Sequence, residues 1–188
     1  MGFSSFYHLF FVRSKYFFDI LQRLDYAGIS ILIFGSAVAP LHYSYSCKDS
    51  AIYREIFMTF LFVSCLSAFV VSILPQFAKP ELKGKRAGIF IACGLSTVVP
   101  CVHNILNSGW NQILPLDPLP YIIGGVFYIT GAVLYGVNVP ERCKPGTFCI
   151  VGSSHQIFHI CVFMGSILHY YANFQLFLRR QHFSCPAQ

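Results

Sequence analysis

The stretch IFMTFLFVSCLSAFVVSIL, Ile56–Leu74, decides the fold of this chain. It contains no charged side chain and is rich in Phe, Val and Leu. A helix needs about 20 mostly apolar residues to cross the hydrocarbon core of a bilayer. The stretch is therefore predicted to be a transmembrane helix.

Four further apolar segments have a similar length and composition. They are Tyr26–Tyr45, Ala87–Leu106, Leu119–Val139 and Ser153–Phe177. An apolar stub over residues 3–12 is too short to span alone, and we interpret residues 1–12 as the tail of a helix whose beginning is absent. Short connections make successive helices antiparallel neighbours. We expect one all-α transmembrane domain over residues 1–188, a polytopic helix bundle with about five complete spans and the end of one more.

The composition indicates a membrane protein and argues against a soluble one. Of the 188 residues, 55% are hydrophobic and 11% are charged, and the mean hydropathy is +0.60. Soluble domains carry roughly 25% charged residues. The net charge of +6 comes from basic residues in short loops, where they act as topology signals, so no nucleic-acid partner is expected.

The basic residues cluster in three loops on one side of the predicted bundle. These residues are Arg13, Lys15, Arg23, Lys79, Lys83, Lys85, Arg86, Arg142 and Lys144. Cytosolic loops carry the excess of Lys and Arg, so this side is placed in the cytosol. Arg179 and Arg180 fall on the other side, but one tail weighs less than three loops.

The eight cysteines do not form a recognisable framework, since they occur singly and without a CxxC pair. Those inside apolar runs behave as small hydrophobic residues. Four others, Cys47, Cys143, Cys149 and Cys185, lie near helix ends. Disulfides among these four are open, but none is predicted.

Ionisable residues inside membrane spans are functional candidates, and four of them share one depth near the cytosolic side. They are His8, Asp25, His155 and His159. His155 and His159 have i, i+4 spacing, so both imidazoles lie on one helix face. With His8 they would supply the three nitrogens of a zinc site. Asp25 would bind a water molecule or orient a ligand, and Ser4, one turn before His8, would support them.

Plainer interpretations of these residues stay open. An isolated HxxxH pair is a weak metal signal, and a lone histidine near a helix end is often an interface residue. Asp25 at the start of a span is also consistent with a favourable interaction with the helix dipole. The remaining histidines (His42, His103, His169 and His182) lie too far from this cluster and are assigned interface or packing roles.

Several stretches of the chain resemble one family. They are SSFYH (Ser4–His8), LDYAGIS (Leu24–Ser30), RAGIFIACGLSTVVPCVH (Arg86–His103), YITGAVLY (Tyr128–Tyr135), VPERCKPG (Val139–Gly146) and SSHQIFH (Ser153–His159). The chain resembles the progestin and adipoQ receptor family, which includes the adiponectin receptors and is related to hemolysin III proteins. Against that family's pattern, the first helix and most of the second are missing, so the chain looks truncated at its N-terminus.

The resemblance implies a seven-helix receptor with a cytosolic N-terminus in the plasma membrane or an internal membrane. It implies zinc held by His8, His155 and His159, with Asp25 contacting the ion through water and Ser4 matching the family's serine. The expected partners are membrane lipid, a lipid amide substrate such as ceramide and an extracellular ligand, in lipid signalling. The alternatives are a non-catalytic receptor or scaffold with a structural zinc ion, and a hemolysin III-like protein.

Overall fold

The computed structural model describes residues 2–47, 50–108, 118–148, 150–182 and 185. Those residues form helices and connecting turns, with no β-strand among them. The longer helices are α1 (Gly2–Phe10), α2 (Lys15–Ser44), α3 (Ala51–Ile73), α4 (Lys83–Leu95), α5 (Val98–Ser108), α6 (Pro118–Val137) and α7 (Ser154–Arg180). Short 3₁₀ turns at Pro75–Ala78 and Pro80–Leu82 join α3 to α4. In the described part of the chain, five helical segments are long and apolar enough to cross a membrane, which confirms the all-α polytopic fold class.

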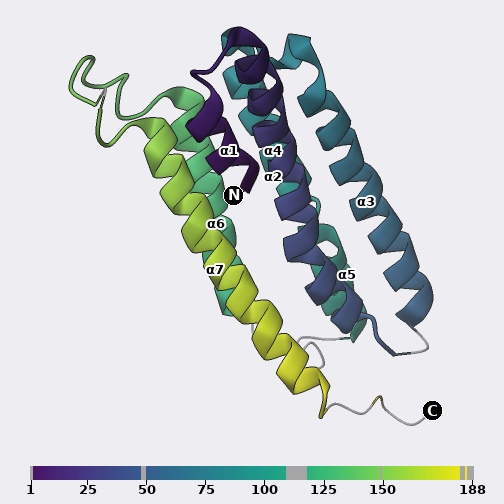
Figure 1. Ribbon diagram of the computed structural model, residues 1–188. Helices are drawn as coiled ribbons and strands as arrows, with labels where there is room; N and C mark the ends of the chain where they lie inside the picture. Colours follow the sequence, from purple (N-terminus) through teal and green to yellow (C-terminus); the bar gives the residue numbers. More distant parts are fainter. Residues whose placement is uncertain (1, 48–49, 109–117, 149, 183–184, 186–188) are drawn as a thin grey trace.

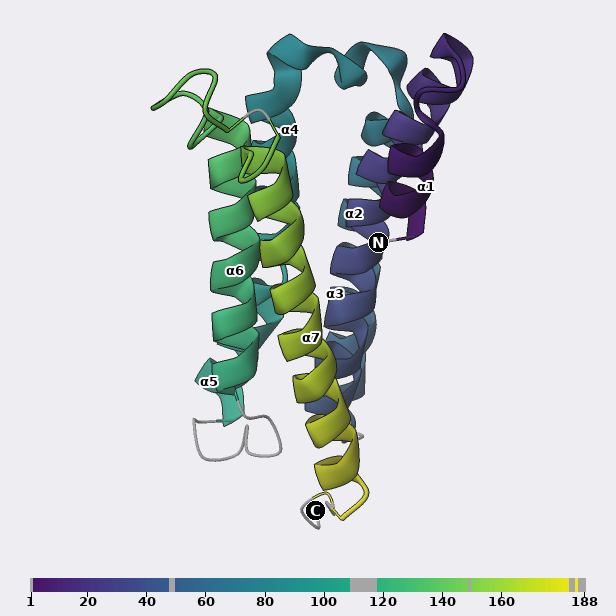
Figure 2. The same cartoon turned by 60° about the vertical axis from the view of Figure 1, so that its left-hand side comes forward.

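The helices pack as antiparallel neighbours in two groups (Figures 1 and 2). One group contains α2 and α3, with α1 running antiparallel to the first turns of α2. The other contains α6 and α7, the closest pair of the bundle, with α4 packed against α6. The start of α2, the end of α3, the start of α4 and the α6–α7 connection all lie at one end.

The outward faces of the helices are apolar. Ile52 on α3 is 62% exposed and Leu106 on α5 is 78% exposed, and many other large hydrophobic side chains are also open to the surroundings. Such a continuous apolar surface is stable in lipid and not in water. The chain is therefore an integral, multi-pass membrane protein, as its composition indicates.

Helix α2 begins well before the apolar run that starts at Tyr26. Ser14 caps it, because its hydroxyl accepts a hydrogen bond from the backbone N–H of Phe17 at 3.3 Å. Arg23, in the polar first turns, donates from Nη1 to the carbonyl oxygen of Ile73 at 3.2 Å. Hydropathy detects only the part of a helix at lipid depth, and these polar turns are held by a cap and by a contact with α3.

The span expected over Ala87–Leu106 is built from two helices. Helix α4 ends at Leu95 and α5 begins at Val98. Pro100 has no backbone N–H, and the first turn of a helix, which is its place in α5, is the position that accommodates proline without losing a hydrogen bond. The hydroxyls of Ser96 and Thr97 donate to the carbonyls of Cys93 and Gly94 at 2.6 and 2.7 Å, so the broken end of α4 is satisfied.

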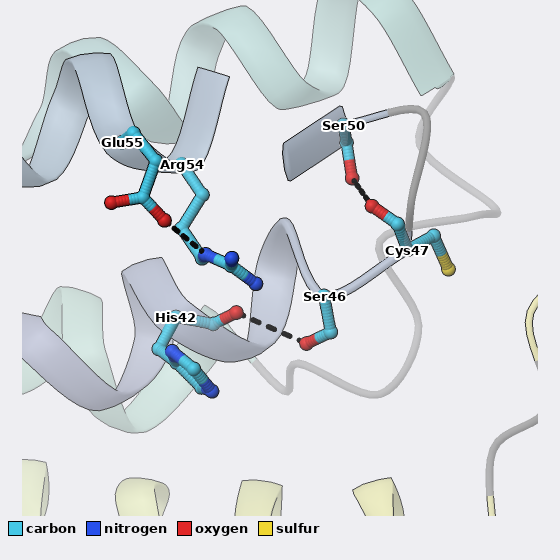
Figure 3. A network of polar contacts seen from close by, with 6 residues as sticks. All are labelled: His42, Ser46, Cys47, Ser50, Arg54 and Glu55. Atoms are coloured by element: carbon cyan, nitrogen blue, oxygen red, sulfur yellow. Dashed lines mark hydrogen bonds and ion pairs between the residues drawn. The ribbon is translucent and has the colours of Figure 1, made fainter. Parts of the chain in front are cut away.

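Polar contacts organise the α2–α3 connection at the opposite end of the bundle (Figure 3). The hydroxyl of Ser46 donates to the carbonyl of His42 at 3.0 Å, and that of Ser50 donates to the carbonyl of Cys47 at 2.9 Å. A disulfide joins Cys47 to Cys185, a pair that spacing along the sequence did not identify. It ties the segment after α7 to the connection between α2 and α3.

Candidate metal centre

Three imidazoles from two distant helices meet at one end of the bundle. His8 comes from α1, and His155 and His159 come from the first two turns of α7. The Nε2 atom of His155 lies 3.1 Å from Nε2 of His8 and 3.1 Å from Nε2 of His159. All three residues offer a ring nitrogen within 4.8 Å of the others. The structure thus brings together the three histidines expected from the sequence.

The local sequence fixes the start of α7 and with it the histidine pair. Ser153 is the N-cap, and its hydroxyl accepts from the backbone N–H of Gln156 at 3.3 Å. Gln156 reaches back, and its Oε1 accepts from the N–H of Gly152 at 2.7 Å. This exchange resembles a capping box. Because the first turn is fixed, His155 and His159 stand one above the other on one face.

Glu141 adds an acidic group at the same helix terminus, although it was not among the site residues expected from the sequence. Its Oε1 accepts two hydrogen bonds from Ser154, one from the backbone N–H at 2.8 Å and one from the hydroxyl at 2.9 Å. Partial burial acts to raise the pKa of Glu141, but these bonds and the charge of Lys83 outweigh it and hold the pKa below its ordinary value. A negative charge here also interacts favourably with the dipole of α7 at its N-terminus. Only its place in the VPERCKPG stretch marked this residue beforehand.

Ser4 and Asp25 lie beside the histidines. Ser4 is buried on α1, and its hydroxyl lies near the Asp25 side chain. Asp25 interacts electrostatically with His8, but its carboxylate is not among the ligand atoms of the three-histidine cluster. A carboxylate in this position can hold or accept a proton next to the cluster without binding the same ion directly.

Arg86 was expected to be a basic residue in a loop, but it is buried in α4. It is only 3% exposed, and its Nη1 donates to the carbonyls of Phe77 and Lys79 at 2.8 and 2.7 Å. Its guanidinium lies over the ring of Tyr26, 4.6 Å from the centroid. Arg86 therefore ties the α3–α4 connection to α4, near the histidine end of the bundle.

His155 and His159 line one end of a partly open cavity of about 730 Å³. At one end Ser4, Asp25, His155 and His159 contribute to its wall, and at the other end Pro118, Tyr121 and His169 do. Between these ends the wall is mostly aliphatic and aromatic, with side chains such as Leu32, Ile129 and Val162. Apolar walls with a few polar groups are typical of a site for a largely apolar ligand.

The other histidines lie apart from this centre. His103 contacts the Tyr45 hydroxyl through Nδ1 at 3.0 Å and also contacts the side-chain amide of Asn107. His42 packs against Tyr43, and its backbone carbonyl accepts from the Ser46 hydroxyl (Figure 3). His169 lines the far end of the cavity. Among the described residues, the ligand cluster contains only His8, His155 and His159.

The chemistry of these three rings fits a bound cation. A neutral imidazole has one N–H donor and one acceptor nitrogen. His155 Nε2 faces ring nitrogens of both His8 and His159. This atom carries either one N–H or one lone pair, so it can form a hydrogen bond with only one of these two nitrogens. A zinc ion bound by three imidazole nitrogens would satisfy all of them. Tetrahedral zinc with Zn–N bonds of ~2.0–2.1 Å places adjacent nitrogens about 3.3 Å apart, close to the 3.1 Å between these ring nitrogens.

Known proteins resemble this chain over most of its length. A family described as Haemolysin-III related matches residues 1–170. The chain is 36% identical to an adiponectin receptor protein of Drosophila melanogaster, over 98% of this chain and 41% of that protein. It is 38% identical to heptahelical transmembrane protein 3 of Arabidopsis thaliana, over 88% of this chain and 48% of that protein. It is 31% identical to progestin and adipoQ receptor-like protein 1 of Caenorhabditis elegans, over 100% and 43% respectively. The chain spans a little under half the length of these three relatives.

Proposed function

Since this chain belongs to the haemolysin-III-related family and resembles its adiponectin and progestin receptor-like members, we propose that it carries a zinc site that hydrolyses a lipid amide such as ceramide. The observation behind the proposal is the convergence of three imidazole nitrogens at the end of an acyl-sized cavity. His8, His155 and His159 would hold the ion. An extracellular ligand, which the family resemblance implies, stays a prediction.

The reaction adds water across an amide and gives a fatty acid and an amine. A bound zinc ion supplies Lewis-acid chemistry, since it acidifies a water molecule and polarises a carbonyl. Asp25 accepts a proton from the attacking water and passes it to the departing amine nitrogen. Ser4, whose hydroxyl lies near the Asp25 side chain, positions the carboxylate. The apolar wall excludes bulk water and aligns the acyl chain.

The proposed orientation puts the histidines at the cytosolic end of the bundle. The basic loops lie at this end, as the positive-inside rule requires. The Cys47–Cys185 disulfide lies beyond the other end of α2 and α7, and disulfides persist in extracellular or lumenal compartments. Two independent features thus favour the same orientation.

A non-catalytic scaffold is the second candidate, and one observation favours it. His8 is on the short helix α1, which packs against α2, whereas the other two histidines are on α7. A zinc ion would therefore join α1 to α7 even without turnover. Chelation would then lower the melting temperature, with no activity to lose.

One set of samples separates the two candidates. Purified chain in detergent is incubated with ceramide, and released fatty acid, zinc content and melting temperature are measured together. The hydrolase proposal predicts product release that disappears in His155→Ala and Asp25→Asn, whereas His182→Ala, in the C-terminal segment, behaves as wild type. Zinc loss and destabilisation in His155→Ala, with no product from any sample, would support the scaffold instead.

A further inference from the structure

A second polar cluster lies deep inside the bundle, away from the three histidines. His169 follows His159 by ten positions on α7, which places it about 15 Å further along the helix axis at 1.5 Å per residue. Tyr121 and Tyr128 on α6 face it, with ring centroids 5.4 and 5.2 Å from the His169 ring. All three side chains line the distal half of the cavity.

This cluster contains buried polar atoms without partners. Among the described residues, neither ring nitrogen of His169 has a hydrogen bond of ordinary geometry, and neither does the hydroxyl of Tyr128. The backbone carbonyl of Tyr121 lies within reach of the imidazole, but one carbonyl can engage only one ring nitrogen. At least one nitrogen of His169 and the hydroxyl of Tyr128 are therefore available to something in the cavity.

Neighbouring polar groups are already engaged with one another. The hydroxyl of Tyr121 donates to Oδ1 of Asn173 at 2.6 Å, and Nδ2 of Asn173 donates to the carbonyl of Ser36 at 3.4 Å. The hydroxyl of Ser36, which lies near Tyr128, donates to the carbonyl of Leu32 at 2.8 Å. These bonds join α2, α6 and α7, and in the described part of the chain they leave the His169 ring nitrogens and the Tyr128 hydroxyl without a hydrogen bond of ordinary geometry.

Glycines hold His169 and Tyr128 in place. A Cβ at Gly124 would lie 2.4 Å from Cδ2 of His169, and a Cβ at Gly165 would lie 2.9 Å from Cε1 of Tyr128. Each ring therefore packs directly on the backbone of the facing helix. A polar side chain fixed so closely cannot turn away to find a partner elsewhere.

A polar group without a partner in a membrane interior indicates that a molecule in the cavity supplies its hydrogen bond. Leaving such a group unpaired is unfavourable, and ionisable residues at this depth are functional candidates. A hydroxyl group fits the pair best, because it accepts from the Tyr128 hydroxyl and donates to a His169 nitrogen, or the reverse. An unsubstituted acyl chain offers neither interaction.

We propose that His169 and Tyr128 form a distal subsite that binds a hydroxyl group carried partway along an acyl chain. The position follows from the geometry. An extended chain with C–C bonds of about 1.5 Å advances about 1.25 Å per carbon, so ~15 Å corresponds to about 12 carbons. The inference shares with the proposed function only the placement of the lipid head at the three histidines, and it requires no catalysis.

Displacement of a fluorescent fatty acid from the purified full chain tests the subsite. The competitors are octadecanoic acid, its 12-hydroxy derivative and its 2-hydroxy derivative. We expect the 12-hydroxy acid to bind about 5-fold more tightly than the unsubstituted acid, as one or two hydrogen bonds in an apolar site would give. The 2-hydroxy acid, whose hydroxyl lies at the wrong depth, should show no such gain.

Variants assign the preference to named atoms. Tyr128→Phe removes only the hydroxyl, and it should reduce the preference by about half or more while the affinity for octadecanoic acid stays unchanged. His169→Phe should abolish the preference, and the matched control Tyr170→Phe, on an exposed side chain, should retain it. Equal binding of the two acids by wild type, or a preference that survives both substitutions, would overturn the inference. A preference that persists in metal-free protein lacking amidase activity would uphold it even though the proposed hydrolysis had failed.

Discussion

Removing Glu141 should weaken metal binding although this residue is not a ligand. Its Oε1 holds both the N–H and the hydroxyl of Ser154, the residue directly before His155. Ser154 is only 1% exposed, so water cannot replace the lost acceptor without opening the helix terminus. Glu141→Ala therefore leaves two buried donors unpaired and frees the first turn of α7.

The size of the effect follows from those two bonds. An unsatisfied buried donor costs about 1–3 kcal/mol of stability. Because the helix terminus can relax in part, we expect Glu141→Ala to lower the free energy of unfolding by about 2–4 kcal/mol in total. Residues that orient a metal-ligating histidine typically change metal affinity by about 10–100-fold, so we expect a loss of this size. Glu141→Gln keeps an acceptor oxygen but removes the charge, and it should lose about 1 kcal/mol or less from the helix dipole.

Acidification removes the charge of Glu141 in the wild type, as Glu141→Gln does. The pKa of Glu141 is below its ordinary value in the folded chain, whereas an unfolded glutamate titrates near pH 4.3. Its stabilising contribution is therefore complete above about pH 4.3 and disappears as the pH falls through the lower, folded pKa. In Glu141→Gln this acid-dependent component should be absent.

Zinc competition with a chelating dye and thermal unfolding in detergent measure both quantities. The matched control is Glu55→Gln, which alters an exposed carboxylate paired with Arg54 at the other end of the bundle and should change little. Zinc affinity in Glu141→Ala equal to that of wild type, with an unchanged melting temperature, would refute the role assigned to Glu141.

Two further predictions concern packing and covalent linkage. Gly124→Ala should destabilise the bundle by about 1–3 kcal/mol, because the new methyl group would overlap His169. The control Gly125→Ala, where nothing lies within 4 Å of the added Cβ, should be nearly neutral in thermal unfolding. Equal effects of the two substitutions would contradict this packing. Reduction of the Cys47–Cys185 disulfide, which closes a loop of 138 residues, should lower stability by up to about 5 kcal/mol. Dithiothreitol should then lower the melting temperature of the wild type but not of Cys47→Ser, and the same sensitivity in both would count against the bond.

Much of the fold was predictable because lipid imposes simple rules. The charge-free run Ile56–Leu74 and its counterparts indicated membrane helices, and the all-helical, multi-pass architecture is confirmed. The family resemblance is confirmed as well. Helix ends were less predictable. Helix α2 starts at Lys15 because Ser14 caps it, and Pro100 lies just after the break between α4 and α5. Hydropathy contains no information on either feature.

The candidate site divides in the same way. The i, i+4 spacing of His155 and His159 and the shared depth of His8 were visible in the sequence, and the structure places the three rings together. Their binding of zinc stays a prediction. Glu141 and the buried position of Arg86 were not visible, because both depend on contacts between segments far apart in the chain. His169 was assigned an interface or packing role, since the lack of hydrogen-bond partners for its ring nitrogens is a property of the folded interior.

X-ray absorption at the zinc edge of the purified, zinc-loaded chain tests the central claim most directly. The account predicts about one zinc ion per chain, surrounded by imidazole nitrogens at ~2.0–2.1 Å, with this nitrogen shell lost in the His155→Ala, His159→Ala double variant. A first shell containing sulfur at ~2.3 Å, or an unchanged nitrogen shell in the double variant, would contradict it.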